Sequence, residues 1–330
     1  MSTIDGSVPI TEINIPGTHD SMTRYIPASV ISRTQTMSVS EQLYSGVRYL
    51  DIRANIIGGE LVGVHSFLSC MESYGLFSNA LSVKSVVEEC KKFLSENKGE
   101  TVLFLFKHEN TENEKEVFSR FYDECVAPDT DAWFLENRVP DLGEVRGKIV
   151  LLRYSEADRT RFNDKNSGLN FENYPYLEED DSNFFPYRSI YSYDESTAIA
   201  YMHVQDSFKL EEGKKIEAIK GFFDSPHFFH DFEICCTNTI ESKSAYVSAQ
   251  QINDFLMSYD FVAGKVYGII SVDFATKELC EKIYMINEPL MTNAPTETRV
   301  PSFTESYGFL GKLFETIRDF ILKLLVIFLN

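Results

Sequence analysis

Short hydrophobic runs alternate along this chain with segments in which hydrophobic residues recur every three or four positions. The runs predict β-strands at residues 13–16, 47–53, 101–107, 148–153, 200–205, 232–237 and 266–273. Helical spacing between several of these runs predicts helices at residues 82–97, 211–223, 248–259 and 276–285. Near-continuous hydrophobic strands that alternate with helices indicate a parallel sheet covered by helices, so we expect an α/β fold.

The number of strand–helix units favours a barrel. About seven units within 330 residues fit a closed (β/α) barrel better than an open doubly wound sheet. The segment 155–195 is rich in Asn, Asp, Pro and Tyr, and we expect it to form loops over the mouth of the barrel. We therefore predict one barrel domain over residues 1–300.

The last part of the chain, residues 301–330, has a different pattern. Ser302 and Glu305 form a potential capping box, after which hydrophobic and charged residues fall on opposite faces of a predicted amphipathic helix. Five charged residues between Leu310 and Leu324 exclude a membrane span, which needs about 20 mostly hydrophobic residues. The segment 303–329 could make peripheral contact with a membrane, pack on the barrel or mediate self-association, and the sequence leaves these alternatives open.

The charge and cysteine content narrow the classes of function. A net charge of −19 argues against nucleic acid, and a phosphate-bearing substrate would need a local positive site. The six cysteines form no CxxC pair and are too sparse for a disulfide scaffold. Residues 1–10 lack the pattern of an export signal, so we expect a cytoplasmic or peripheral membrane protein, or a secreted one if a signal has been removed.

Polar residues at the ends of predicted strands are the candidates for chemistry. Asp51 and Arg53 lie two positions apart on one strand and therefore face the same way. A carboxylate beside a guanidinium suits the binding of an oxyanion, because arginine presents a planar fork that matches phosphate oxygens. An ordinary ion pair inside the barrel is the alternative interpretation.

Two histidines lie at predicted strand ends in the same half of the predicted barrel. His19 is adjacent to Asp20, and His65 ends the short run Gly63-Val64-His65. A single histidine is more often structural than catalytic. A pair of imidazoles, with ordinary pKa values of about 6.5, supplies one base and one acid at neutral pH. Together with an arginine and neighbouring carboxylates, the pair provides the parts needed to break a phosphodiester without a metal ion.

The remaining histidines are weaker candidates. His227 and His230, close to Asp231, have a spacing that resembles a metal site. Pro226 and the surrounding phenylalanines favour a loop instead, so a zinc site is the less favoured interpretation. Glycine-rich phosphate loops and the patterns GxSxG and HExxH are absent from the sequence.

Longer motifs surround the candidate residues and extend beyond them. They are Ile15-Pro16-Gly17-Thr18-His19-Asp20-Ser21, Gly46-Val47-Arg48-Tyr49-Leu50-Asp51-Ile52-Arg53, Val64-His65, Phe104-Leu105-Phe106-Lys107, Arg146-Gly147-Lys148-Ile149-Val150-Leu151-Leu152-Arg153, Val204-Gln205-Asp206-Ser207-Phe208 and Ser271-Val272-Asp273-Phe274. In these motifs the chain resembles a phosphatidylinositol-specific phospholipase C of the X-domain family, chiefly its bacterial, metal-independent members. Thr34-Gln35-Thr36-Met37 is closer to the small eukaryotic X-domain proteins, and the whole resemblance covers about residues 10 to 290.

The resemblance implies a distorted TIM barrel and a reaction. Phosphatidylinositol in membranes would be cleaved to diacylglycerol and a cyclic inositol phosphate. In the family pattern His19 is the general base, assisted by Asp273. His65, paired with Asp20, is the general acid.

The resemblance also assigns the cation of the site. Arg53 would stabilise the phosphate, and Asp51 would tune the same cluster. Calcium-dependent relatives carry a carboxylate where this chain has Arg53. A fixed cation thus replaces the ion, and we predict neither a metal nor another cofactor.

Four further residues are implied in substrate binding. Lys107, Arg153 and Asp206 would bind inositol hydroxyls, and Phe208 would stack where the bacterial enzymes have a tyrosine. The sequence does not decide between free phosphatidylinositol and glycosylated phosphatidylinositol anchors. Two other functions compete: an inositide-binding module without activity, and a metal-dependent glycerophosphodiester phosphodiesterase. The latter would need a Glu-x-Asp pair, which the segment 51–53 lacks.

Overall fold

Strands and helices alternate through most of the described chain. A computed structural model describes residues 1–28, 32–75, 77–175, 187–239 and 244–292. The strands are β1 (Ile15–Thr18), β2 (Tyr49–Ile57), β3 (Glu60–His65), β4 (Leu68–Ser69), β5 (Val102–His108), β6 (Trp133–Phe134), β7 (Ile149–Arg153), β8 (Leu169–Asn170), β9 (Tyr187–Tyr191), β10 (Ala198–Gln205), β11 (Phe232–Cys236) and β12 (Ile269–Val272). The α-helices are α2 (Val39–Tyr44), α3 (Val83–Glu96), α4 (Glu114–Phe121), α5 (Leu142–Val145), α6 (Glu212–Asp224), α7 (Ala245–Ser258) and α8 (Lys277–Tyr284). Short 3-10 or π turns are η1 (Ile10–Glu12), η2 (Thr23–Tyr25), η3 (Tyr122–Val126), η4 (Ala127–Ala132) and η5 (Met285–Leu290).

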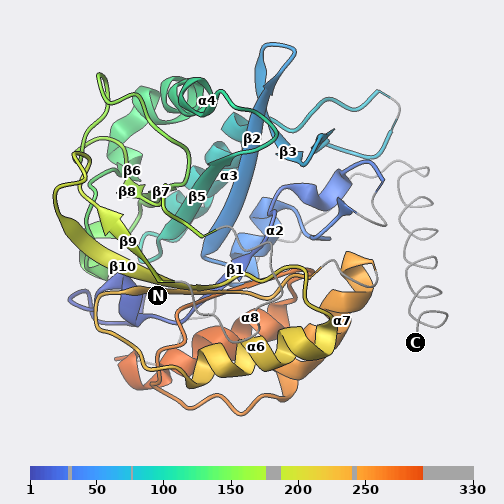
Figure 1. Ribbon diagram of the computed structural model, residues 1–330, viewed down its shortest axis with the longest axis vertical. Helices are drawn as coiled ribbons and strands as arrows, with labels where there is room; N and C mark the ends of the chain where they lie inside the picture. The colour runs from blue at the N-terminus through green and yellow to red at the C-terminus, as the bar shows by residue number, and fades with distance from the viewer. Residues whose placement is uncertain (29–31, 76, 176–186, 240–243, 293–330) are drawn as a thin grey trace.

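One curved sheet forms the centre of the molecule, with helices outside it (Figure 1). Its strands follow the order β6-β7-β5-β2-β1-β12-β11-β10-β9, and every pairing from β6 to β10 is parallel. The first strand therefore lies between β2 and the last strand, β12, as the circular order of a (β/α) barrel requires. Among the described residues β6 and β9 each pair with a single strand, so hydrogen bonds do not close the barrel. The predicted distorted barrel is confirmed, and this open seam is part of its distortion.

Side chains alternate between the two faces of the sheet and build two hydrophobic clusters. The inner cluster fills the barrel and includes Ile15, Tyr49, Leu103, Leu105, Val150, Leu152, Met202, Val204, Ile234 and Ile269. The outer cluster packs the sheet against the helices and includes Leu50, Ile52, Phe104, Phe106, Ile149, Leu151, Cys235, Ile270 and Val272. A strand residue of the inner cluster therefore faces the barrel interior, and so do the residues two positions away from it on the same strand.

The predicted strands and long helices are confirmed in type and place. At these elements the hydrophobic pattern and the capping residues indicate the same boundaries. Helix α3 begins at an N-cap serine, Ser82, whose side chain accepts a hydrogen bond from the backbone N–H of Ser85 at 3.1 Å. The prediction of loops over residues 155–195 is wrong in part, because β8 and β9 lie in that segment. Strand β9 pairs antiparallel with β10, and β3 pairs antiparallel with both β2 and β4, so antiparallel hairpins interrupt the regular alternation.

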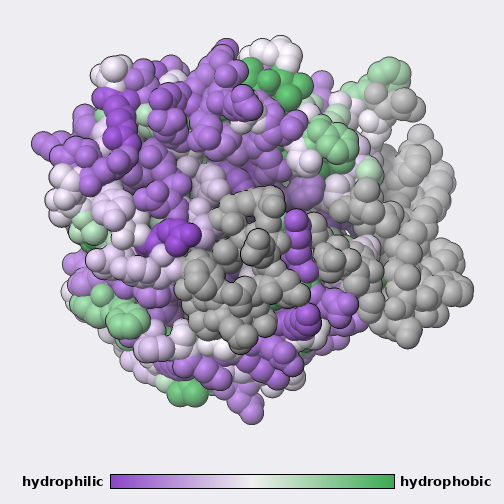
Figure 2. Space-filling view, in the orientation of Figure 1, coloured by the Kyte–Doolittle hydropathy of each residue, from purple (hydrophilic) through white to green (hydrophobic). Residues whose placement is uncertain are grey.

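The described surface is largely polar, and the cysteines form no cross-links. The face in Figure 2 is mainly hydrophilic with small hydrophobic groups, in agreement with the high net charge. All six cysteines are buried free thiols. Within the described residues no helix combines the length and hydrophobicity needed to cross a bilayer. The predicted tail helix at 301–330 lies outside the described residues.

Candidate active site

Polar side chains gather at the carboxyl ends of the central strands. His19 follows β1, Asp51 and Arg53 lie on β2, and Asp273 follows β12. Because β1, β2 and β12 are parallel neighbours, their carboxyl ends meet at one rim of the barrel. Tyr49 belongs to the inner cluster, so the alternation along β2 also directs Asp51 and Arg53 toward the barrel interior.

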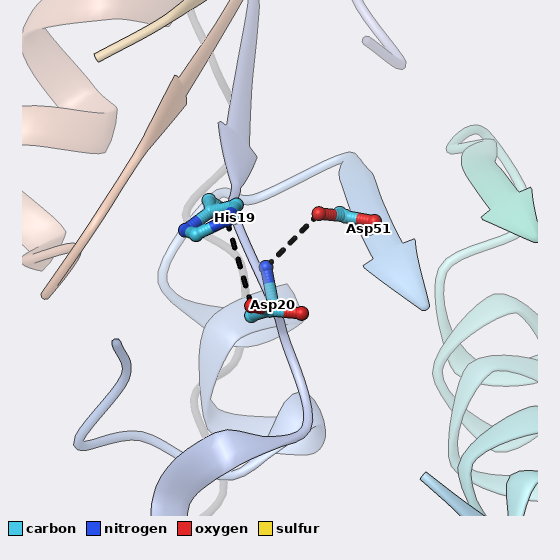
Figure 3. Close-up of side chains that lie close together, drawn as sticks. All are labelled: His19, Asp20 and Asp51. Carbon is cyan, nitrogen blue, oxygen red and sulfur yellow. Dashed lines mark hydrogen bonds and ion pairs between the residues drawn. The ribbon is translucent and has the colours of Figure 1, made fainter. Parts of the chain in front are cut away.

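His19 lies between two carboxylates, and Figure 3 shows its contact with one of them, Asp20. Its Nδ1 is 2.8 Å from Asp273 Oδ1, and its Nε2 is 3.5 Å from Asp20 Oδ2. The backbone N–H of Asp20 donates to Asp51 Oδ2 at 3.2 Å, which ties this turn to β2 (Figure 3). With Nδ1–H donating to Asp273, a neutral His19 has Nε2 as its proton acceptor.

Asp20 joins the second histidine to the arginine. Its Oδ2 accepts a short hydrogen bond from His65 Nδ1. Its Oδ1 lies 2.9 Å from Arg53 Nε. The predicted pairing of His65 with Asp20 is therefore present in the structure, with Arg53 on the other oxygen of the same carboxylate.

Carboxylates also hold the guanidinium of Arg53. Its Nε and Nη2 donate to Asp51 Oδ2 at 3.0 and 2.9 Å, and its Nη1 donates to Glu109 Oε2 at 3.1 Å. Among the described contacts each terminal nitrogen keeps an unused N–H for an oxyanion. The buried Asp51 Oδ1 has no hydrogen-bond partner among the described residues, so it is an open acceptor.

Glu109 is a site residue that the sequence interpretation missed. It follows β5 and also accepts a short hydrogen bond from the backbone N–H of Ser66, next to His65. The signal was its spacing from Lys107, two residues earlier. Leu103 and Leu105 of β5 face the interior, so the same alternation points Lys107 and Glu109 inward.

Three residues beside the polar cluster have left-handed backbone conformations. Asp20 has a φ of 44°, Ser66 of 55° and Phe274 of 50°. Residues without the freedom of glycine adopt this region at a cost of about 1–3 kcal/mol, and such positions concentrate at functional sites. They flank His19, His65 and Asp273.

A clamp formed by Thr34 and Gln35 holds two of these turns. Gln35 Nε2 donates to the carbonyls of His19 and Val272 at 3.0 and 2.8 Å. Gln35 Oε1 accepts from the backbone N–H of Ala275 at 3.2 Å. The Thr34 hydroxyl donates to the His19 carbonyl at 3.1 Å. The turns after β1 and β12 are thus fixed to each other by a buried side-chain pair.

Electrostatics favour charged forms throughout the cluster. Burial lowers the pKa of His19, but Asp273 and then Asp20 outweigh it and raise the pKa from 6.5 to about 9. Burial likewise lowers the pKa of His65, and the Asp20 carboxylate reverses the effect to give a raised pKa. Burial would raise the pKa of Asp20, whereas Arg53, His65 and His19 together bring it well below its ordinary value.

Lys107 and Asp206 face the same interior. The Lys107 ammonium lies 4.9 Å from the centre of the Tyr154 ring, and burial, followed by the nearby Arg53, lowers its pKa. Burial raises the pKa of Asp206 against the positive charges around it, which include Arg53 and Lys107. Phe208 lies in the turn after β10, where its carbonyl accepts from the Thr239 hydroxyl at 3.2 Å.

Arg153 is not brought to the cluster. Val150 and Leu152 of β7 fill the inner cluster, so alternation turns Arg153 to the outer face of the sheet. There its guanidinium lies 5.6 Å from the centre of the Phe118 ring and donates to the carbonyl of Ser155 at 2.7 Å. It also pairs with Glu172, so its contacts are structural. The expectation that it binds an inositol hydroxyl has no support from this geometry.

The cluster contains a possible set of metal ligands. One ligand atom each from His19, Asp20 and Asp51 lies within 4.8 Å of the others. Arg53, however, contacts both carboxylates of this set and neutralises them. The set therefore already holds a cation of its own, and the predicted independence from metal remains a prediction for experiment.

The fold is that of a barrel with a polar cluster at its carboxyl-terminal rim, and comparison with known proteins shows which family a part of the chain resembles. Residues 10–154 match the model of the phosphatidylinositol-specific phospholipase C X domain. These residues, less than half of the chain, are similar to that family.

Curated relatives carry the name 1-phosphatidylinositol phosphodiesterase. The protein of Listeria monocytogenes is 30% identical over 202 residues, which are 56% of this chain and 57% of the relative. The protein of Staphylococcus aureus strain Newman is 25% identical over 294 residues, which are 83% of this chain and 87% of the relative. The Listeria match thus spans little more than half of that relative's length.

Solved structures support the fold. The phosphatidylinositol-specific phospholipase C of Listeria monocytogenes superposes with a TM-score of 0.64 and 22% identity, over 87% of this chain and 97% of its own. A structure of the Staphylococcus aureus enzyme gives a TM-score of 0.63 and 22% identity, over 85% and 95% of the two chains. The similarity of architecture therefore extends well beyond residue 154.

Proposed function

We propose that the protein is a phosphatidylinositol-specific phospholipase C that releases diacylglycerol and inositol 1,2-cyclic phosphate without a metal ion. One observation carries the proposal: two imidazoles, each hydrogen-bonded through Nδ1 to a carboxylate, lie around a single buried guanidinium. The relatives named as phosphatidylinositol phosphodiesterases supply the substrate class. Glycosylated phosphatidylinositol remains an alternative substrate for the same site.

The first proton transfer belongs to His19. With Nδ1–H held by Asp273, the Nε2 atom of neutral His19 takes the proton of the inositol 2-hydroxyl. The oxygen then attacks the neighbouring phosphorus and forms the cyclic ester. Because hydroxyl and phosphorus belong to one molecule, the substrate itself supplies most of the proximity.

The second proton transfer belongs to His65. Its Nε2–H donates to the diacylglycerol oxygen as the bond between that oxygen and phosphorus breaks, and Asp20 stabilises the imidazolium beforehand. The two products together contain all atoms of the substrate. His19 has gained the proton of the 2-hydroxyl, and His65 has given a proton to the diacylglycerol oxygen. No water enters the step, which makes the reaction that of a phosphorus–oxygen lyase.

Arg53 supplies the charge stabilisation. The N–H groups left on its two terminal nitrogens point to a role on the phosphoryl oxygens, while Asp51, Asp20 and Glu109 fix the plane of the guanidinium. The inositol ring would lie against Lys107 and Asp206, with Asp51 Oδ1 as a further acceptor and Phe208 as a stacking surface. Arg153 has no part in this assignment.

Phosphorus NMR of phosphatidylinositol vesicles tests the proposal. We expect a cyclic inositol phosphate signal from the wild type in excess EDTA, and its loss in His19→Ala and His65→Ala. His203→Ala is the matched control, because His203 lies on β10 and bonds Asp231 outside the cluster. Full activity of either site variant would overturn the assigned roles. Loss of activity in EDTA that a divalent ion restores would favour the metal-dependent phosphodiesterase, to which the ligand geometry at His19, Asp20 and Asp51 also points.

A further inference from the structure

A buried lysine outside the barrel has no role in the reaction described above. Lys215 lies on α6 and is fully buried. Its Nζ donates to the backbone carbonyl of Ser207 at 3.2 Å, and Ser207 directly follows Asp206. A buried ammonium is unfavourable unless nearby groups compensate its charge, so its presence at this point requires a physical reason.

Asp206 and Lys215 approach the end of β10 from opposite sides. Val204 belongs to the inner cluster, so alternation directs Asp206 to the barrel interior. Lys215 reaches the same turn from the helix layer. The charged and titratable groups that act on Asp206 are Lys215 of α6, His19, Arg53 of β2 and Lys107 of β5. Those that act on Lys215 are Asp206, Cys235 and Cys236 of β11, and Asp273.

The two groups compensate each other electrostatically. Burial raises the pKa of Asp206, and the charge of Lys215 is the largest of the opposing influences. Burial lowers the pKa of Lys215, and the charge of Asp206 is the largest influence against it. Each group therefore favours the charged form of the other.

We propose that Lys215 is a positioning residue for substrate binding: it holds the turn at Ser207 and places a buried positive charge behind Asp206, whose carboxylate accepts hydrogen bonds from ring hydroxyls of the substrate. The inference rests on the proposed function, because the hydroxyls are those of the inositol ring. An ionised carboxylate offers acceptors on both oxygens, whereas a protonated one replaces an acceptor with a donor. Lys215 thus acts on the substrate through Asp206 without touching it.

Carbon-13 NMR of the Asp206 carboxyl in the unliganded full chain tests the charge coupling without turnover. Lys215→Met should raise the pKa of Asp206 by about one unit. Lys215→Arg should restore it, because the charge returns. Lys220→Met is the matched control, since Lys220 is an exposed lysine of the same helix. An identical Asp206 titration in the Lys215→Met and Lys220→Met proteins would overturn the proposal.

Kinetics on phosphatidylinositol vesicles test the consequence for binding. Lys215→Met should lower kcat/KM about tenfold at acid pH, mostly through KM, and should move the acid decline associated with Asp206 to higher pH. In an Asp206→Asn background the same substitution should have no further effect, and additive losses would overturn the proposal. A wild type without activity would defeat the proposed function, whereas the NMR titration would still decide on Lys215.

A folding measurement covers the case in which Lys215→Met does not fold. Asp206→Asn alone should then lower the urea midpoint of unfolding, because the buried ammonium of Lys215 loses its compensating carboxylate. An unchanged midpoint in that variant would overturn the proposal.

Discussion

At the scale of single residues, Asp20 organises the site. One of its oxygens accepts from His65 and the other lies against Arg53, while His19 is 3.5 Å away. A carboxylate that is shared among these three groups has a pKa well below its ordinary value, so it is ionised at neutral pH. The acid and the phosphate-binding cation are therefore coupled through one side chain.

Asp273→Asn should move the acid limb of kcat/KM to lower pH. The base form of His19 exists only above its pKa, and after the opposing effect of burial the Asp273 carboxylate is the largest influence that raises this pKa to about 9. Its removal lowers the pKa, so neutral His19 appears at lower pH. The plateau should fall by about 10²-fold, because the imidazole loses its orienting acceptor. A pH–rate profile of the variant beside Asp231→Asn, which alters a histidine partner outside the cluster, would check this; an acid limb that stays in place would contradict it.

Most site residues could be predicted from the sequence because they sit in short motifs at strand ends. His19, Asp20 and Asp51 come together through backbone continuity and parallel pairing, which a strand prediction already contains. Arg153 could not be placed, because the face of a strand residue depends on which neighbours fill the barrel. Glu109 was missed because a carboxylate one residue beyond a strand has no distinctive signal until its partner Arg53 is located.

At the scale of elements, the site depends on a clamp between two turns. Strands β1 and β12 pair in parallel, but the turns after them carry the chemistry and have left-handed residues. Gln35 bonds three backbone groups of these turns. The clamp therefore compensates the local strain and sets the distance between His19 and Asp273.

Gln35→Ala should lower the free energy of unfolding by about 2 kcal/mol. The substitution leaves the buried N–H of Ala275 without its partner and removes one of two hydrogen bonds from each of the carbonyls of His19 and Val272; an unsatisfied buried group costs about 1–3 kcal/mol before relaxation. Urea unfolding would measure the change. Gln250→Ala is a control of the same chemistry, because Gln250 is an exposed glutamine of α7. Equal stability of the two variants would show that the clamp does not hold the turns.

The sequence missed strand β9 for a physical reason. Strand β9 is mostly exposed on its first half and lacks a hydrophobic run, so nothing in its own pattern distinguishes it from a loop. Its conformation comes from the antiparallel pairing with β10, between residues such as Ser189 and Tyr201. The parallel strands could be predicted because they are buried on both faces and therefore consist almost entirely of hydrophobic residues.

At the scale of the whole molecule, two histidines, one buried and one half-buried, should make the folded state less stable as the pH becomes alkaline. His19 and His227 both have a pKa raised from 6.5 to about 9. Burial opposes the shift at His19, whereas at His227 a hydrogen bond to Glu233 is the main cause, followed after burial by Glu12. A raised pKa in the folded state stabilises it fully below pH 6.5, and the contribution is lost as the pH rises through about 9.

The free energy of unfolding should therefore decline between about pH 6.5 and 9, by on the order of 3 kcal/mol from His19 alone. His227→Gln should remove one proton from this dependence and make the slope shallower by up to about 1.4 kcal/mol per pH unit. Urea titrations at several pH values would measure both slopes. A slope that is the same in the variant and the wild type would contradict the role of the pair that His227 makes with Glu12 and Glu233.

The net charge of the whole molecule limits how the protein can contact a lipid. A net charge of −19 gives no attraction to anionic membranes, so contact has to be hydrophobic. Phe67 follows His65 by two residues in the turn between β3 and β4 and is 77% exposed, and Phe77 is 98% exposed. These rings are the two most exposed large hydrophobic side chains among the described residues, and the tail after Val300 is the other candidate.

Binding to phosphatidylinositol vesicles should therefore not weaken as salt is added, because screening reduces only the repulsion between like charges. If the rings of Phe67 and Phe77 anchor the protein, replacing both by serine should weaken sedimentation with vesicles severalfold. Phe228→Ser should not, although Phe228 is also an exposed ring, on the loop before β11. Truncation after Val300 should weaken binding only if the tail is an anchor. The variant with both rings replaced should lose turnover of vesicles and keep the cleavage of a short-chain monomeric phosphatidylinositol. That result would separate membrane contact from chemistry. Equal losses on both substrates would show that these rings serve the site rather than the membrane.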